Sequence, residues 1–534
     1  MRLLRRTCCA LIAFCIPLTA AIAANDGSSP EYDGPKDKLH IYLLIGDALM
    51  EDGAETSKEP GQVIDRCYLL NKKGKWEPAK GRLNRYSTVA AENDTHDFAP
   101  AYSFAKAMLK KDKTISIGLI VNAGTNSRIE DWHGKSDYYR GARGRTKKAL
   151  RSGTLKGILW HHGMDSFNTT RIDNLKDLVA YLRVDLDDLN LPFIVGEIPG
   201  STFVNNIYAA FSDDVHATAI ASADGFKTSA KGILDEESQK TLGERYAKEV
   251  LSVQAKVAAR EKSRLTWDIP LIDTHVHASS NKKNGLDVAA KWMNKNNIER
   301  IVTHALTPTR PVGEEQRKIM RANFQKYKGK IYRFCIIEPD EVNTVEEAVA
   351  ILKKEKADGA IGFGEHYGRN MMFDDPKNMC LYAACEKVGL PIMFHIDQNK
   401  NMDAKNFPHL RNALQTYPKC IFIAHAQWWM QLPSGVCDRM LQEYPNLYAD
   451  PSGRGMAALL NRDRKYTEKF LIRNADKIMY GNDDGWWSIK DAKQEQLLFT
   501  VLEELDLPQD VRTKIYRGNA EKLFGFTDDT KPTE

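Results

Sequence analysis

Short apolar segments alternate with helical patterns along most of this 534-residue chain, and this alternation limits the possible folds more than any other feature. In the first half, apolar runs lie at 39–46, 115–121, 157–161 and 192–198. Helical patterns lie at 100–111, 174–186 and 238–254. Alternation of this kind predicts a parallel sheet covered by helices on both faces, that is, a doubly wound α/β domain at 38–255.

The alternation restarts after a charged stretch at 256–268, which we interpret as a linker between two domains. Eight further strands are expected, at 270–277, 299–306, 331–337, 359–366, 391–396, 420–425, 446–450 and 477–483. Eight strand–helix units within 269–526 are typical of a closed (β/α)8 barrel, or TIM barrel. An open doubly wound sheet is the competing interpretation.

The N-terminal segment has the pattern of an export signal. Three arginines precede an apolar stretch, and Ala21-Ile22-Ala23 is a small-x-small cleavage pattern. We therefore expect a signal peptide at 1–23, a polar linker at 24–37, a tail at 527–534, and a mature protein that is periplasmic or secreted. A retained membrane anchor is the alternative, although the apolar stretch is short for a membrane span.

The charge balance limits the classes of partner. The 76 Lys and Arg residues and the 71 Asp and Glu residues give a formal charge of only +5, and no basic stripe is present. A nucleic-acid-binding protein is normally more basic or carries such a stripe. We therefore expect a small-molecule substrate, no nucleic acid, and no stable membrane insertion after the signal is removed.

Histidine and acidic side chains recur where the predicted strands of the second half end. They are His275, His277, Glu365, His395, His425 and Asp483. In a TIM barrel these carboxyl ends meet at the face that carries the catalytic groups. Imidazoles and carboxylates are typical ligands of zinc. The sequence therefore predicts a divalent-metal site in the barrel.

Residues 270–525 resemble the amidohydrolase superfamily, and most of all its amidohydrolase-2 branch of metal-dependent TIM-barrel hydrolases and decarboxylases. The resemblance is carried by IDTHVH at 272–277, FHID at 394–397, IAHAQ at 423–427, YGNDD at 480–484 and GNAEKLFGF at 518–526. Barrels of this branch are often dimers, so the resemblance also makes a homodimer an option.

The resemblance implies a role for each candidate side chain. His275, His277 and His395 correspond to metal ligands, and His425 is either a ligand or a group that polarises the substrate. Asp483 corresponds to a ligand that also accepts a proton from the attacking water.

The fourth strand departs from the family pattern. Many relatives carry a bridging lysine at its end, whereas this chain has Glu365 there. Glu365 then either bridges a second metal or binds substrate, so one zinc ion or two are expected.

Four side chains close to predicted strand ends are candidates for substrate binding. They are Trp428, Trp486, Arg454 and Arg369. Tryptophan rings stack against flat ligands, and an arginine holds a carboxylate through paired hydrogen bonds. Packing at the barrel rim and solvated arginines are the alternative interpretations.

The first half resembles the sialate O-acetylesterase-like (SASA) branch of the SGNH-hydrolase fold. The resemblance is carried by the segments at 41–53, 117–132, 157–166 and 238–247. The family's nucleophilic serine and oxyanion asparagine are replaced by Ala48 and Leu49, and its Gln and Glu by His162 and Met164. The segment between His216 and His275 also contains no histidine that could act as the general base. Because these groups depend on one another, this domain is expected to be inactive.

The sequence thus predicts an exported, metal-dependent hydrolase that activates water to cleave an ester, lactone or amide of a carbohydrate-derived small molecule. The link to carbohydrate depends on the resemblance of the first half to esterases. Two alternatives stay open, a metal-dependent decarboxylase on the same barrel and a non-catalytic glycan-binding protein.

Overall fold

The computed structural model describes most of the chain after residue 31. The described residues are 32–47, 50, 63–90, 100–124, 127–163, 170–228, 234–263, 268–280, 282–304, 314–485, 489 and 497–526. Several predicted features lie outside them, namely the signal peptide at 1–23, the tail at 527–534, Ala48, Leu49, Met164 and Trp486. Among the described residues, no helix combines the length and the apolar character needed to cross a membrane.

The N-terminal domain is built on one sheet with the strand order β3-β2-β4-β1-β5-β6-β7. Within the described residues its strands are β1 (Leu39–Gly46), β2 (Cys67–Leu70), β3 (Trp76–Pro78), β4 (Ser116–Val121), β5 (Thr154–His161), β6 (Phe193–Gly196) and β7 (Thr218–Ala221). The pairs are parallel except for β2 with β3, which is antiparallel. The four apolar runs predicted in this half correspond to β1, β4, β5 and β6.

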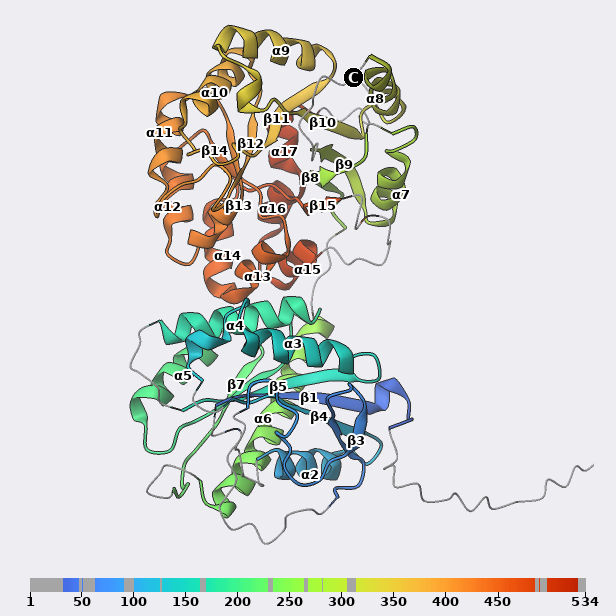
Figure 1. Ribbon diagram of the computed structural model, residues 1–534, viewed down its shortest axis with the longest axis vertical. Coiled ribbons are helices and arrows are strands. Elements are labelled where there is room, and N and C mark those ends of the chain that lie inside the picture. Colours follow the sequence, from blue (N-terminus) through green and yellow to red (C-terminus); the bar gives the residue numbers. More distant parts are fainter. Residues whose placement is uncertain are drawn as a thin grey trace, which may run out of the picture.

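Helices cover both faces of this sheet (Figure 1). They are α2 (Ala101–Lys111), α3 (Asp137–Ala149), α4 (Arg171–Asp185), α5 (Thr202–Asp214) and α6 (Glu236–Ser263). Successive side chains of β1 enter different cores: Ile41 and Leu43 pack with α3, α4 and α5, whereas Tyr42 and Leu44 pack with α2 and α6. This alternation is the expected result of the two-residue period of a strand. It confirms a doubly wound α/β domain.

The predicted linker at 256–268 begins as helix, because α6 continues to Ser263. The end of α6 touches the second domain, where Arg260 donates a hydrogen bond of 2.7 Å to the carbonyl oxygen of Glu504. The charged stretch without an apolar face is therefore an exposed helix end and not an irregular connection.

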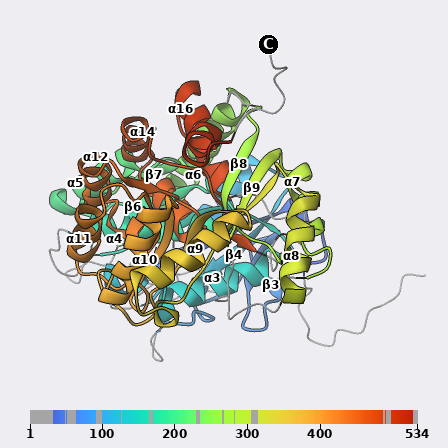
Figure 2. The same ribbon diagram turned by 90° about the horizontal axis from the view of Figure 1, so that it is seen from above.

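The C-terminal domain is a ring of parallel strands surrounded by helices (Figure 2). Its described strands are β8 (Leu271–His277), β9 (Ile298–Thr303), β10 (Ile331–Cys335), β11 (Ala360–His366), β12 (Ile392–Ile396), β13 (Phe422–Ala426), β14 (Leu447–Ala449) and β15 (Asp484–Gly485). Its described helices are α7 (Asp287–Lys295), α8 (Glu314–Lys326), α9 (Val345–Ala357), α10 (Pro376–Val388), α11 (Pro408–Thr416), α12 (Val436–Glu443), α13 (Arg454–Arg462), α14 (Arg464–Arg473), α15 (Leu497–Glu504), α16 (Gln509–Thr513) and α17 (Asn519–Phe524).

The segment 477–483 closes the ring between β14 and β8, as the sequence predicts for the eighth strand. On one side, Met479 N donates to the carbonyl of Ala449 over 3.0 Å; on the other, Thr274 N donates to the carbonyl of Tyr480 over 2.9 Å. Among the described residues of this part of the ring, the two residues of β15, next to this segment, are the only ones that form a regular strand. The barrel is therefore closed, and the open-sheet alternative is wrong.

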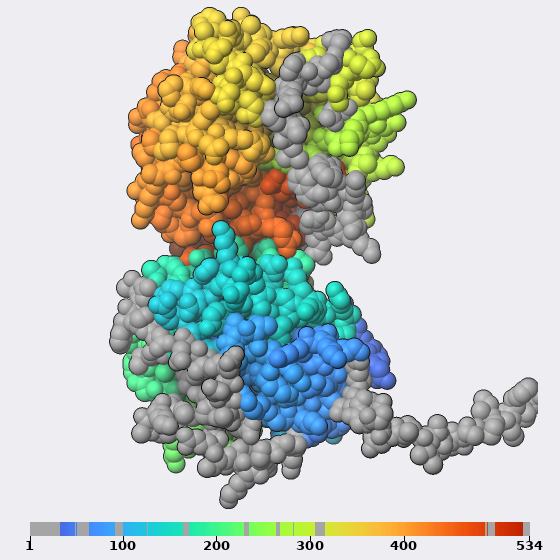
Figure 3. Space-filling model, in the orientation of Figure 1, coloured from blue at the N-terminus to red at the C-terminus, as the bar shows by residue number. Residues whose placement is uncertain are grey.

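The two domains form separate lobes (Figure 3), and α4 of the first domain lies where they meet (Figure 1). On the barrel side, the contact is made by α13 and α14. Ala180, Val184 and Leu189, which belong to the first domain, are buried in the same apolar cluster as the barrel helices.

Candidate metal centre

The predicted metal-site residues meet at the carboxyl ends of the barrel strands. Strand β8 supplies His275 and His277, and Asp483 stands just before β15. The other members come from neighbouring strands: Glu365 from β11, His395 from β12 and His425 from β13. These six side chains form three overlapping groups in which the potential ligand atoms lie within 4.8 Å of one another.

The carboxylates of Glu365 and Asp483 each approach the Nε2 atoms of both His275 and His277. Glu365 Oε2 lies 3.6 Å from His275 Nε2 and 3.5 Å from His277 Nε2. Asp483 Oδ1 lies 3.7 Å and 3.1 Å from the same two nitrogens. Four ligands about 2.1 Å from one ion, at the corners of a tetrahedron, stand about 3.4 Å apart. The spacing therefore fits a single zinc-sized ion.

Hydrogen bonds at the far side of two rings leave their Nε2 atoms available as ligands. His275 Nδ1 donates to Asp450 Oδ2 over 2.7 Å, and His277 Nδ1 donates to the carbonyl of His304 over 3.2 Å. His275 is fully buried, and among the described residues its Nε2 has no hydrogen-bond partner. Because a buried polar atom is costly without a partner, this orphan nitrogen fits a site that holds a cation.

Glu365 also faces a second group through its other oxygen. Its Oε1 lies 2.6 Å from His395 Nδ1 and 3.6 Å from His425 Nε2. The far nitrogen of His395 lies 3.0 Å from Asp397 Oδ2. One carboxylate thus touches both groups with different oxygens, the contact to His395 being a hydrogen bond, and Glu365 could serve as a ligand shared by two metal ions.

Burial and nearby charges set the protonation of the site. Burial and the neighbouring charge of His275 lower the pKa of His425 to about 4, so this imidazole is neutral at pH 7. Burial raises the pKa of Asp483, but the hydrogen bond from His277 and the charge of His275 outweigh it and bring the pKa to about 2. Burial lowers the pKa of His275, but the charge and the hydrogen bond of Asp450 outweigh it and raise that pKa well above its usual value. A metal binds neutral imidazole and ionised carboxylate, so binding at His275 would release a proton.

Sequence reasoning missed Asp450 and Ser452, which lie in the connection between β14 and α13. Ser452 Oγ donates to Asp450 Oδ2 over 3.0 Å and lies 3.0 Å from His425 Nδ1, which therefore donates to the serine. This series of hydrogen bonds leaves a lone pair on His425 Nε2. It therefore favours His425 as a metal ligand over His425 as a group that polarises the substrate. An acid at the end of the predicted strand 446–450 was the signal that could have identified Asp450.

A cationic rim, formed by Arg369 and Lys400, lies beside this centre. An antiparallel backbone bridge joins the two residues, and both side-chain cations lie over the ring of Tyr367, at 4.8 Å and 4.6 Å from its centre. The Tyr367 hydroxyl donates to Glu365 Oε2 over 2.9 Å. Arg369, which is exposed, was predicted from the sequence, whereas Tyr367 and Lys400 were not.

Two predicted substrate contacts lie elsewhere. Trp428 is fully buried and its ring stacks on Phe407, so the ring packs the barrel and is closed to substrate. Arg454 donates to the carbonyl of Val184 over 2.6 Å and to Asp187 over 2.9 Å, both in the first domain. It is therefore a contact between domains and not a clamp for substrate.

In the first domain, His162 is buried in a network of its own. Its ring stacks on Trp160, and its Nε2 lies 2.7 Å from the carbonyl of Ser127. Arg171 Nη2 lies 2.8 Å from His162 Nδ1, and Asp47 accepts a hydrogen bond from the backbone of Gly163. These side chains are therefore engaged with one another and with the backbone around them.

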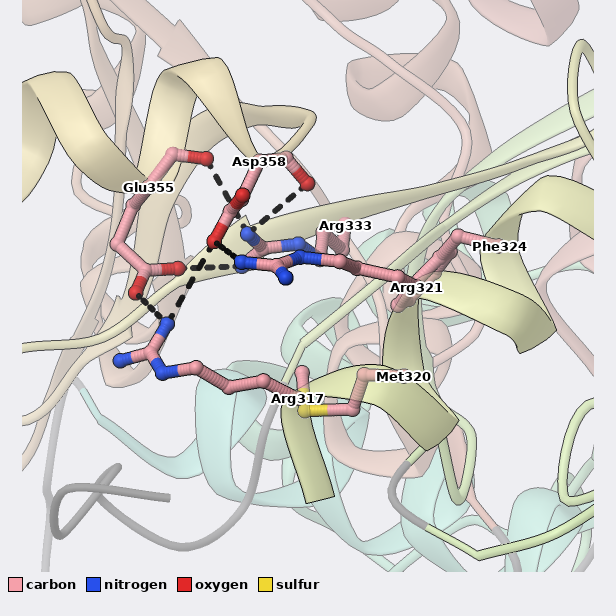
Figure 4. A pocket seen from close by; sticks show the side chains of 7 residues that line it. All are labelled: Arg317, Met320, Arg321, Phe324, Arg333, Glu355 and Asp358. Carbon is pink, nitrogen blue, oxygen red and sulfur yellow. Dashed lines mark hydrogen bonds and ion pairs between the residues drawn. The ribbon is translucent and has the colours of Figure 1, made fainter. Parts of the chain in front are cut away.

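A small cavity of about 20 Å³ is lined by residues of α8, β10 and α9 and its end and by none of the predicted site residues (Figure 4). It is lined by the arginines of α8 and β10 and by Glu355 and Asp358. Arg333 pairs with Glu355 at 2.8 Å, and Arg321 pairs with Asp358 at 3.0 Å. These ion pairs connect α8 and β10 to α9 and its end, so the cluster is structural.

Two family models match the chain. Residues 38–252 match the family described as carbohydrate esterase, sialic acid-specific acetylesterase, and residues 272–526 match the family described as amidohydrolase. No curated protein matches the chain.

Solved structures are similar to parts of the chain. A protein from Arabidopsis thaliana is 22% identical over 40% of this chain and 98% of its own, with a TM-score of 0.36. A probable 2-pyrone-4,6-dicarboxylic acid hydrolase from Acinetobacter baumannii is 14% identical over 48% of this chain and 100% of its own, also with a TM-score of 0.36. A 5-carboxyvanillate decarboxylase from Novosphingobium aromaticivorans, solved with manganese, is 13% identical over 50% of this chain and 98% of its own, with a TM-score of 0.33.

The family matches agree with the two folds described above and with the metal-ligand set at the barrel face. The chain thus combines an N-terminal domain that matches sialic acid-specific acetylesterases with a C-terminal barrel that matches amidohydrolases, and the second match supports a metal-dependent hydrolase or decarboxylase.

Proposed function

We propose that the barrel hydrolyses an ester, lactone or amide of a small acidic carbohydrate derivative, with a zinc ion bound at its carboxyl-end face. The observation that carries this proposal is a set of four contacts of 3.1 to 3.7 Å that join the carboxylates of Glu365 and Asp483 to the Nε2 atoms of His275 and His277, of which His275 Nε2 has no hydrogen-bond partner among the described residues. A bound zinc ion lowers the pKa of a coordinated water to about 7 and polarises a carbonyl.

The residues around this point hold and move the proton. Asp483 is ionised and accepts the proton of the attacking water, and it then returns that proton to the leaving group. His275 and His425 are held in their orientation by Asp450 and Ser452. Glu365 contacts both ligand groups, which supports a second metal bridged by its carboxylate.

Metal removal tests this function directly. Protein freed of metal by a chelator should lose hydrolysis of sugar-acid lactones and esters, and added Zn²⁺ should restore it. The number of equivalents that restores full activity, one or two, decides whether Glu365 bridges two ions. Activity that survives complete metal removal would contradict the proposal.

The same metal-free protein tests the first domain, which we propose to be inactive. Supporting observations are the replaced esterase residues and the closed network around His162. An acetylated sugar should stay intact in its presence, and its hydrolysis would show an active esterase.

The cationic rim of Arg369 and Lys400 supports a substrate that carries a carboxylate. Replacing both residues by alanine should raise KM for such a substrate while kcat changes little. The reason is that the contact stabilises the bound substrate and the transition state equally. A charge-assisted hydrogen bond contributes about 1.5–3 kcal/mol, so at least a tenfold increase for each cation is expected. Initial rates against substrate concentration measure this effect.

The matched control for the rim is an uncharged substrate, in which an amide replaces the carboxylate. Its KM should be the same for the native protein and for the double variant. An equal increase of KM for both substrates would show that the rim does not recognise the carboxylate.

The cationic rim also favours decarboxylation as a second candidate, because it can hold the group that is lost. Product analysis separates the two reactions. Release of carbon dioxide from an aromatic or sugar acid without consumption of water would replace the hydrolase by a decarboxylase.

A further inference from the structure

Helix α4 of the first domain is bound to the barrel by buried charges. Arg462, at the end of α13, lies 2.7 Å from Asp173 and 2.5 Å from Asp177. Lys176 lies 2.9 Å from Asp463, which precedes α14. The side chains of Arg462 and Lys176 are each only 8% exposed, whereas those of Asp173 and Asp177 are 59% and 44% exposed, so the cations are buried and their partners reach solvent.

Apolar contacts make the same interface continuous with the barrel core. Ala180, Val184 and Leu189 are buried in the cluster that also contains Ala457 and Leu460 of α13. A shared core with paired charges at its edge holds α4 and α13 in one orientation. The N-terminal domain therefore fixes the position of α13.

The opposite end of α13 reaches the metal centre. Arg454 is its first residue, and its guanidinium binds the carbonyl of Val184 and the carboxylate of Asp187. Two residues earlier, Ser452 contacts His425, and the backbone N–H of Gly453 donates to the carbonyl of Asn482 over 3.3 Å.

The connection between β14 and α13 therefore has three attachments. Asp450 and Ser452 orient His275 and His425, Gly453 holds the residue that precedes Asp483, and Arg454 is held by the other domain. A shift at Arg454 is transmitted through two peptide units to groups that aim metal ligands. Such outer groups strongly influence metal affinity.

We infer that the N-terminal domain acts as a buttress for the metal centre and that Arg454 is the positioning residue through which it acts. The inference rests on the proposed function only in assuming that the barrel binds a divalent metal. It gives a domain without esterase residues a part in the chemistry of its neighbour.

The test compares Arg454→Ala with Arg462→Ala in the full-length protein. Both changes remove an arginine that connects α13 to α4, but only Arg454 stands beside the metal centre. Co²⁺ serves as the probe: its visible absorption reports ligand geometry, competition with a chelator reports affinity, and thermal unfolding without metal reports stability.

We expect one variant to lose affinity for Co²⁺ and the other to lose thermal stability. Arg454, half exposed, should matter little for stability, but its loss should weaken Co²⁺ binding about tenfold and alter the absorption spectrum. Arg462 is buried against two carboxylates, so its loss should lower the unfolding temperature and leave Co²⁺ affinity near the native value.

Two results would overturn the inference. Native affinity and spectrum in Arg454→Ala would show that the domain contact does not reach the site. Affinity losses that follow the stability losses in both variants would reveal general destabilisation instead of positioning. A native protein that binds no Co²⁺ would defeat the proposed function as well, so the two failures are distinguishable.

Discussion

The His275→Ala variant is expected to lose bound metal and turnover together. His275 supplies the Nε2 atom that lies close to both Glu365 and Asp483, and alanine leaves that position without a ligand. Metal catalysis contributes several kcal/mol, so kcat/KM should fall by about a thousandfold or more. Elemental analysis of the purified variant and the native protein, beside an activity assay, measures both effects.

A matched control is available in His409, a half-buried histidine of α11 that pairs with Asp374 at 2.8 Å. His409→Ala should keep the native metal content and activity, since its ring lies outside the ligand groups. Native metal content in folded His275→Ala would remove the basis for the proposed centre. Circular dichroism of both variants verifies that each is folded.

Asp483→Asn should abolish most turnover while metal stays bound. Asparagine keeps the shape and one oxygen of aspartate, and His275, His277 and Glu365 remain as one of the ligand groups, but the amide cannot accept the proton of water. Loss of a general base costs about 10²- to 10⁴-fold, and this decrease should appear in kcat at saturating Zn²⁺. Steady-state kinetics with parallel metal analysis measure it.

Asp484→Asn is the control, because the adjacent carboxylate lies outside the ligand groups of the described residues. Its kcat should stay close to the native value. If instead Asp484→Asn is the variant that loses turnover, the proton acceptor has been assigned to the wrong aspartate.

Sequence reasoning predicted the fold well where long apolar runs decide it. The run at 39–46 is β1 because every second side chain enters a different core. The short strands β2, β3 and β7 escaped prediction because segments of three or four residues carry too little pattern. Strands β2 and β7 are placed by pairing with β4 and β6, and β3 is placed by pairing with β2.

The potential metal ligands of the candidate site could be predicted from the sequence. The residues that orient those ligands through hydrogen bonds could not. His275, His277 and Glu365 lie at the ends of strands that apolar runs in the sequence already predict. Asp450 binds His275 across 175 positions of sequence, and no local pattern reports such a contact. The role of Arg454 could not be predicted either, because it depends on which surface of the barrel the other domain covers.

The shared core between α4 and α13 has an evolutionary consequence. Ala180, Val184 and Leu189 fill the barrel's apolar cluster, so deletion of the first domain would expose apolar surface and favour aggregation. If the first domain is inactive, as we propose, selection would still retain its fold for the sake of the barrel.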